Sequence, residues 1–401
     1  MRFRRWLAVV MTGLLVVGCG KREVNIVPLS PQQAKPIASA EWVLAERFLA
    51  RNLNKYPNES WVFSPTSLSV CATMLREGLE GKSNQELAKV LGQQLEISPY
   101  RSAYKTLCSN YSQAGGAMRM AQAMWVRKGF EVRPTYSNSV MDLYRAEVTE
   151  ERFDDNAIKH INEWASQNTD GMIHRLLDDI GADSVLILLQ ATLFHDDWRE
   201  TFEPSDTTKQ NFTTATGKEV ECDMMGRYGE YMYSQNGRYQ AVEIPYKTGF
   251  KMRIVLPAQG KKLSSVLDGL ILTMRNPLSM WSGFVQIPKW STEVSCDLMK
   301  FFVASGAKQL FQPSSDFAKV SNVAPMNVSK VIQKAKIIVD EQGTKAAAVT
   351  ETEVVAGEAG QGDPFEFIAN RPFVYAIISP ENLPVFIGVV NNPTAKAASL
   401  D

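Results

Sequence analysis

Hydrophobic and polar positions alternate with a period of two along residues 344–356. One set of alternate positions is small or β-branched and uncharged: Thr344, Ala346, Ala348, Thr350, Thr352, Val354 and Ala356. The other set holds every charge of the segment, in Lys345, Glu351 and Glu353. Such alternation predicts a strand with one buried and one solvated face.

The composition of the same segment is nevertheless typical of an exposed loop. Three consecutive alanines, 346–348, form strands poorly, and a turn-rich stretch, 357–364, follows them. A short helix is the alternative, because alanine favours helix, although the β-branched residues of 349–355 oppose it. The sequence therefore predicts a segment that is a loop in one state and a strand in another.

Elsewhere the pattern predicts helices first and strands later. Apolar residues recur at helical spacing over 37–53, and a second helix is expected to begin at Ser64 and Pro65. Further helices are expected up to about residue 176. Strand-like runs then follow at 185–189, 252–256, 284–288, 336–339, 374–379 and 385–390. This order predicts an α+β fold built on a large sheet.

The N-terminus has the features of a targeting segment. Three arginines precede an apolar run, 6–17, that is too short to span a bilayer comfortably. The run ends in Leu-Val-Val-Gly-Cys, which resembles a bacterial lipobox and makes Cys19 the expected lipidation site. We expect a lipoprotein signal peptide over 1–18, a tether over 19–39, and a protein anchored in the bacterial outer membrane or at the cell surface. The alternative is a secretory signal with an incidental cysteine.

Charge and length narrow the possible partners and the possible domain organisation of the chain. The chain has 43 basic and 43 acidic residues and no basic cluster, so a nucleic-acid partner is not expected. Apolar residues make up 45% of the chain, enough for a large core, and no long linker or internal repeat divides it. We therefore expect one domain over 40–393, followed by a tail over 394–401.

Candidate catalytic and metal-binding residues are few. The three histidines lie outside any H-E-x-x-H pattern, and neither a G-x-S-x-G elbow nor a phosphate-binding loop is present. Ser64 is expected to be a helix cap. Cys71 is expected to be a buried thiol. The even number of cysteines after Cys19, namely Cys71, Cys108, Cys222 and Cys296, permits disulfides but does not predict them. We expect no enzyme activity, no metal and no cofactor.

Motifs spread along the whole chain resemble those of the serpin family, and they occur in the family's order. They are 58–69 (NESWVFSPTSLS), 78–87 (GLEGKSNQEL), 122–130 (QAMWVRKGF), 190–198 (QATLFHDDW) with Phe202, 242–246 (VEIPY), 287–290 (IPKW), 341–348 (EQGTKAAA), 371–375 (RPFVY) and 383–393 (LPVFIGVVNNP). The resemblance implies three β-sheets, eight or nine helices and a reactive-centre loop over 341–371 exposed at one end. It also implies a monomer that traps a target endopeptidase covalently when the cut loop inserts into the central sheet.

Further residues are assigned by this resemblance, position by position. The hinge that enters the sheet first corresponds to Glu341, Gly343, Thr344, Ala346, Ala347 and Ala348. Lys289 corresponds to the salt-bridge partner of Glu341. The alternative is that Glu341 and Lys289 are two unrelated surface charges. Trp198 corresponds to an aromatic plug at the same place.

Below the sheet, Ser64 and Ser67 correspond to hydroxyls that help it to part. Gln190 and Gln333 stand where the family usually has Asn and His. Two amides can bond each other, so a hydrogen bond between Gln190 and Gln333 is expected at this place.

The bond that a protease would cut lies further along the loop. Family spacing from Glu341 leads to Gly357, followed by Glu358, and the long loop allows a slip of a few residues. Between Lys345 and Arg371 there is no Lys or Arg, which argues against a trypsin-like target. Val354, Val355 and Ala356 suit the shallow pocket of an elastase-like or subtilisin-like protease, and Glu358 leaves a glutamyl-specific protease as an alternative. Two other functions remain as alternatives. The chain could be a non-inhibitory binding protein of the same fold, or it could be an acyl hydrolase.

Overall fold

The computed structural model describes residues 26–113, 116–266, 274–275, 277–344, 363–395 and 398–400. In this part of the chain the α-helices are α1 (Pro31–Lys55), α2 (Pro65–Arg76), α3 (Gly81–Leu91), α4 (Ser98–Tyr111), α5 (Pro134–Tyr144), α6 (Asp155–Asn168) and α8 (Met299–Ala304). Short 3-10 helices are η1 (Pro204–Asp206), η2 (Leu263–Val266) and η3 (Gln309–Phe311). Helix α2 begins as expected, with Ser67 N donating to Ser64 Oγ at 3.2 Å.

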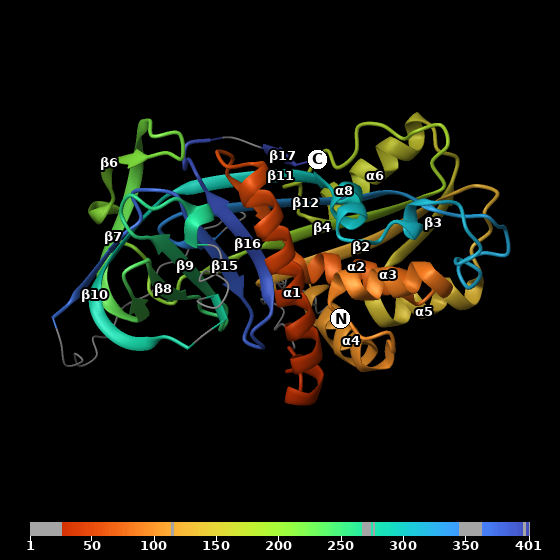
Figure 1. Cartoon of the computed structure of the whole chain (residues 1–401), viewed down its shortest axis with the longest axis horizontal. Coiled ribbons are helices and arrows are strands. Elements are labelled where there is room, and N and C mark those ends of the chain that lie inside the picture. Colours follow the sequence, from red (N-terminus) through yellow and green to blue (C-terminus); the bar gives the residue numbers. More distant parts are fainter. Residues whose placement is uncertain are drawn as a thin grey trace, which may run out of the picture.

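The central sheet runs the length of the molecule, in the order β17, β11, β12, β4, β2, β3 (Figure 1). Two short strands, β13 and β5, extend it beside β12. The strands are β2 (Met118–Arg127), β3 (Glu147–Glu151), β4 (Leu186–Phe194), β5 (Asp196–Asp197), β11 (Trp290–Asp297), β12 (Val328–Val339), β13 (Gly343–Thr344) and β17 (Ala398–Leu400). Strands β12 and β4 are parallel neighbours at the centre.

The second sheet has the order β1, β16, β15, β9, β8, β7, β10, β14, with β6 beside β7. Its strands are β1 (Trp61–Phe63), β6 (Thr208–Thr213), β7 (Glu219–Gln235), β8 (Tyr239–Pro245), β9 (Lys251–Pro257), β10 (Ser279–Pro288), β14 (Phe365–Ile368), β15 (Phe373–Ile378) and β16 (Pro384–Val390). The expected second and third sheets are continuous here, because β7 pairs with β10 and β6 along most of its length and with β8 at its end.

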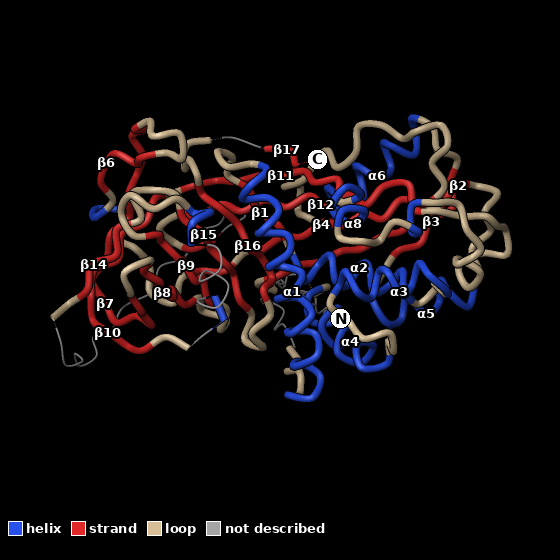
Figure 2. The backbone as a smooth tube through the Cα atoms, in the orientation of Figure 1, coloured by secondary structure: helices blue, strands red, loops and turns tan. Residues whose placement is uncertain are grey.

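Helices α2–α6 gather at one end of the molecule and the strands β6–β10 at the other, with α1 between them (Figure 2). Every residue of β4 is buried, because both faces of the central sheet are covered. Helix α6 packs on one face through Ile161 and Trp164, whereas the twelve residues of α2, all buried, lie behind the other. The α+β class is confirmed, and so are the six strand runs expected from the sequence.

Three boundaries differ from the expectations. Helix α1 begins at Pro31, inside the expected tether 19–39, because Ser30 and Gln33 form a capping box and Ile37 is buried. The expected tail 394–401 contains β17, which pairs in parallel with β11, and Leu400 is buried. Strands β2 and β3 lie within the region expected to be helical. The start of α1 is set by the local capping box, whereas β2, β3 and β17 form through tertiary pairing.

Candidate functional site

The start of the expected reactive loop is already a strand of the central sheet. Strand β13 lies between β12 and β5, and Thr344 is paired with Val339 on one side and Asp196 on the other. The Thr344 side chain is fully buried, and its Oγ1 lies 2.6 Å from Tyr246 Oη. The expectation of exposure throughout 341–371 is therefore wrong at this end, because backbone pairing holds the first residues in the sheet.

Gly343 allows this close pairing. A Cβ atom built on Gly343 would lie 2.2 Å from the carbonyl oxygen of Asp196 and 2.7 Å from Asp197 Cα. Both neighbours are backbone atoms, so they cannot move aside as a flexible side chain would. Any larger residue at position 343 would force β13 and β5 apart.

Trp198 packs directly behind the same segment. Its ring is fully buried and stacks on Tyr246 with centroids 4.3 Å apart. Its backbone N donates to Gln342 O at 2.8 Å, and its Nε1 donates to Asp340 O at 3.0 Å. Trp198 therefore holds the backbone that leads into β13 through two donors.

The structure brings Glu341 and Lys289 together. Lys289 Nζ lies 2.8 Å from Glu341 Oε2, and Thr207 Oγ1 donates to Glu341 Oε1 at 3.0 Å. Burial alone would raise the pKa of Glu341, but the hydrogen bonds with Lys289 and Thr207 outweigh it, so the pKa lies below its usual value. The contacts of Glu341 with Lys289 and Thr207 therefore hold the backbone in place directly before Gln342.

Asp196, the other neighbour of β13, is a buried carboxyl group. Burial is the main cause that raises its pKa to about 6, and the nearby charge of Asp197 adds to the rise. Thr248 opposes the rise because both its hydroxyl and its backbone N donate to Asp196 Oδ2. The edge against which β13 pairs therefore has a charge that depends on pH.

Ser64, Gln190 and Gln333 meet beneath the middle of the central sheet. Gln333 Nε2 donates to Gln190 Oε1 at 3.0 Å and to Ser64 O at 3.0 Å, and Gln333 Oε1 accepts from Ser64 N at 2.8 Å. Ser64 Oγ donates to Val385 O at 2.7 Å. Ser67 Oγ is buried without a hydrogen-bond partner in the described part of the chain. The two amides thus bond each other across β4 and β12.

The pairing of β4 with β12 decides whether another strand can enter the sheet. It runs in parallel from Val328 beside Leu186 to Lys336 beside Leu193. Strand β13 stands beside β12 just beyond this ladder, where β12 is no longer paired with β4. A longer strand that continued from β13 would have to separate β12 from β4 residue by residue, and the Gln190–Gln333 bond lies on that path.

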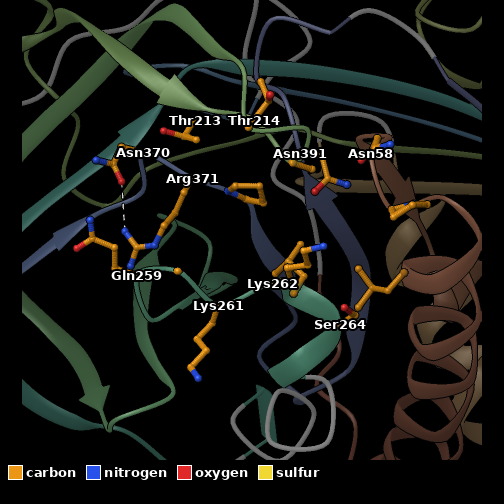
Figure 3. Close-up of a pocket in the computed structure, with 17 residues that line it drawn as sticks. Asn58, Thr213, Thr214, Gln259, Lys261, Lys262, Ser264, Asn370, Arg371 and Asn391 are labelled. Carbon is orange, nitrogen blue, oxygen red and sulfur yellow. Dashed lines mark hydrogen bonds between the residues drawn. The ribbon is translucent and has the colours of Figure 1, made fainter.

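The distal end of the loop is anchored as well. Strand β14 pairs in parallel with β10, and buried Phe365 stacks on Tyr233 with centroids 3.8 Å apart. Arg371 donates from Nε and Nη2 to Pro257 O at 3.0 and 2.7 Å. Its Nη1 donates to Asn370 Oδ1 at 3.2 Å (Figure 3). Arg371 also lines a cavity of about 620 Å³ beside Lys261 and Lys262. Exposure up to residue 371 is therefore contradicted at this end too.

Several expected site residues lie outside the described part of the chain. They are Cys19, Ala346, Ala347, Ala348, Val354, Val355, Ala356, Gly357 and Glu358. Sequence reasoning in turn missed Tyr246, Asp196 and Thr248, which contact β13 or its neighbour. The motif 242–246 contained Tyr246, but its contact with Thr344 spans 98 positions and left no local signal.

Groups that could support other chemistry are sparse among the described residues. No cluster of three potential metal ligands occurs there, and His160 pairs with Glu151 at 2.7 Å on the surface. Cys71, Cys108, Cys222 and Cys296 are buried and form no disulfide with one another, as expected for Cys71. No helix in the ranges described is long and apolar enough to cross a membrane.

Comparisons with known proteins agree with this geometry. Residues 43–393 match the family model described as "Serpin (serine protease inhibitor)". A serpin-like protein of Thermococcus kodakarensis is 30% identical over 348 residues, covering 84% of this chain and 81% of its own. The plasma serine protease inhibitor of Homo sapiens is 28% identical, covering 84% and 85%.

Solved structures of the same fold also match most of the chain. Human thyroxine-binding globulin superimposes with a TM-score of 0.81 at 23% identity, covering 91% of this chain and 100% of that one. Serpin48 of Tenebrio molitor gives 0.81 at 23%, covering 89% and 98%. At these identities the likeness shows the fold alone, whereas the family match rests on the sequence. The chain is a member of the serpin family, whose general activity is the inhibition of proteases.

Proposed function

We propose that this protein inhibits a serine endopeptidase, or alternatively a cysteine endopeptidase, by a suicide mechanism. The protease nucleophile attacks a carbonyl of the loop, an ester or thioester bond to the protease forms, and the peptide C–N bond breaks to release a new amino terminus. The cut segment then continues from Thr344 into the sheet, between β12 and β4, and carries the acyl-enzyme with it. The position of Thr344, buried and paired in β13, is the observation that supports this most strongly.

Insertion is favourable if each entering residue fits a buried position. Backbone hydrogen bonds contribute roughly 1 kcal/mol each, net of lost bonds to water. The alternate positions that follow Thr344, namely Ala346, Ala348, Thr350, Thr352 and Val354, are small or β-branched and uncharged. None of them requires a charge to be desolvated, which would cost several kcal/mol. The segment therefore meets the condition for an entry that outruns hydrolysis of the acyl-enzyme.

The target that fits the loop best has a shallow, apolar specificity pocket. Val354, Val355 and Ala356 are small, and the first aromatic residue after Lys345 is Phe365, which is anchored in β14. We infer an elastase-like or subtilisin-like enzyme that cuts within 354–358. Glu358 keeps a glutamyl-specific protease as the second choice.

The rival function is ligand or partner binding without inhibition, because a neighbour of the same fold is named a thyroxine-binding globulin. Incubation with elastase, boiling in SDS and mass spectrometry of the released peptide separate the possibilities. A covalent band with a peptide that starts within 355–359 supports inhibition. Cleavage without a band supports the non-inhibitory alternative, and repeated turnover of an ester substrate by the protein alone would instead support a hydrolase.

The location is a separate proposal. A lipid on Cys19 would hold the inhibitor, as a monomer, in the bacterial outer membrane or at the cell surface, with the residues before Pro31 as the tether. Labelling of cells with radioactive palmitate tests this. The wild-type protein should take up label and sediment with membranes, whereas Cys19→Ser should do neither. Equal labelling of both would contradict the lipid anchor.

A further inference from the structure

A small cavity lies near β13, on the other side of the aromatic residues that pack behind it. Its volume is about 210 Å³, and its walls come from the end of α4, the start of β2 and the turns that follow β8 and β15. Tyr111, Met118, Phe250 and Pro380 make most of the lining apolar. An apolar cavity of about 150 Å³ is enough to hold benzene. This cavity can therefore hold one ring with a short side chain.

One wall of the cavity carries a carboxylate oxygen without a partner in the part of the chain described. Glu381 Oε2 is buried and has no hydrogen-bond partner among the described residues. The other polar side chain at this end, Asn110, is already used, because its amide bonds both Val27 N and Val27 O. A buried acceptor without a donor is costly, and the cost is greater for a carboxylate. The cavity thus lacks one cationic donor next to an apolar body.

A row of aromatic rings leads from the cavity to the hinge. Tyr111 and Phe250 lie 6.2 Å apart, Phe250 and Phe194 lie 5.2 Å apart, and Phe194 and Tyr246 lie 5.1 Å apart between ring centroids. Tyr246 in turn touches Thr344 through its hydroxyl. Two members of this row line the cavity and the last one holds the strand.

A polar route connects the same two places. Thr248 lines the cavity, and its hydroxyl donates to Asp196, whose backbone pairs with Thr344. The cavity wall and β13 therefore share neighbours through packing and through hydrogen bonds. A ligand that restrains Phe250 and Thr248 would restrain the surface on which β13 is held.

We propose that this cavity binds a small arylalkyl amine, with its ammonium group on Glu381 and its ring against Phe250, and that the bound ligand holds β13 in the sheet. When β13 leaves, the contact of Thr344 with Tyr246 is lost and the aromatic row can relax into the cavity. The ligand therefore has a higher affinity for the state with β13 inserted, which is what a population shift requires. Binding of the amine and retention of β13 do not depend on protease inhibition; only the consequence for the rate of inhibition rests on the proposed function.

Calorimetry with 2-phenylethylamine, 2-phenylethanol and phenylacetate tests the binding on the unmodified chain. These probes share a ring and differ in charge. The amine should bind, the alcohol at least tenfold more weakly, and phenylacetate not at all, because a charge-assisted bond contributes a factor of about ten or more. Glu381→Gln should remove the preference for the amine, whereas Glu366→Gln, at an exposed position of β14, should not. Equal affinity for the three probes, or no binding of the amine, would overturn the site.

Hydrogen exchange of the amides of Gln342, Gly343 and Thr344 tests the coupling. At one hundred times its dissociation constant, the amine should slow their exchange by about tenfold or more. Tyr246→Phe, which removes the hydroxyl contact with Thr344 at a residue that does not line the cavity, should weaken that protection while leaving the amine bound. Exchange that is unchanged by saturating amine would overturn the coupling, whatever the outcome of the protease gel.

Discussion

Thr344 Oγ1 and Tyr246 Oη lie 2.6 Å apart in a fully buried contact, so the hinge of the reactive loop is seated before any protease acts. Tyr246 is stacked on Trp198, and Trp198 holds the carbonyls of Asp340 and Gln342. In the proposed mechanism, the first step of insertion has therefore been taken in the uncut chain. Cleavage would add the freedom for the rest of the segment to follow.

Thr344→Arg should separate cleavage from trapping. The arginine would have to enter a position that is fully buried in the sheet, and an unpaired buried charge costs several kcal/mol. Cleavage of the loop should persist while the SDS-stable complex falls by at least tenfold. Thr344→Ser, which keeps a small hydroxyl for Tyr246, is the matched control and should form the complex. Retention of the complex by Thr344→Arg would contradict the role of this position.

Gly343→Ala should expel β13 from its place between β12 and β5. The added methyl group would lie 2.2 Å from Asp196 O, and overpacking against backbone costs about 1 to 3 kcal/mol. Exchange of the amide of Thr344 should become at least tenfold faster. Gly237→Ala, where a Cβ meets nothing within 4 Å, should leave that exchange unchanged. If both variants exchange alike, Gly343 is not required for the pairing.

Asp196 should make stability depend on pH between about 4 and 6. The pKa of Asp196 in the folded chain, about 6, lies above the ordinary 3.8. Its carboxyl group therefore contributes fully to the free energy of unfolding below pH 3.8, and this contribution is lost as the pH rises to 6. The loss is on the order of 3 kcal/mol. Asp196→Asn should remove it, and the melting temperatures of the two proteins should therefore diverge as the pH rises from 4 to 7. Parallel curves would show that Asp196 titrates normally.

Gln333→Ala should weaken the centre of the sheet. It removes the partner of Gln190 and of both backbone groups of Ser64, at a cost of roughly 3 kcal/mol for buried groups left unpaired. The melting temperature should fall. Gln259→Ala, on the exposed loop after β9, is the matched control and should melt like the wild type. An equal effect of both substitutions would remove the assigned role of the amide pair.

The family motifs were sufficient to predict the pairs Glu341–Lys289 and Gln190–Gln333, because their partners lie at recognisable positions. The helix start at Ser64 and the strand runs followed from local chemistry and periodicity. These features depend on residues close in sequence or on motifs that keep their order. For that reason they can be predicted without knowledge of the tertiary contacts.

Other features depend on contacts that no local pattern records. The burial of Thr344 comes from Tyr246, and the strand at 398–400 forms because β11 offers a free edge. Prolines near the N-terminus suggested a tether, yet Pro31 starts α1 under a capping box. The long strand β7 joins two expected sheets because its two ends have different partners. Apart from the start of α1, which the local capping box sets, each of these outcomes is decided by packing between distant segments.

The proposed inhibition requires the cut segment to become a strand between β12 and β4. The melting temperature of the chain after complete cleavage by elastase tests this most directly. About ten new backbone hydrogen bonds, at roughly 1 kcal/mol each, should raise it by about 10 °C or more above that of the uncut chain. A melting temperature that is unchanged or lower after cleavage would mean that the loop was nicked and stayed outside the sheet, and would contradict the account.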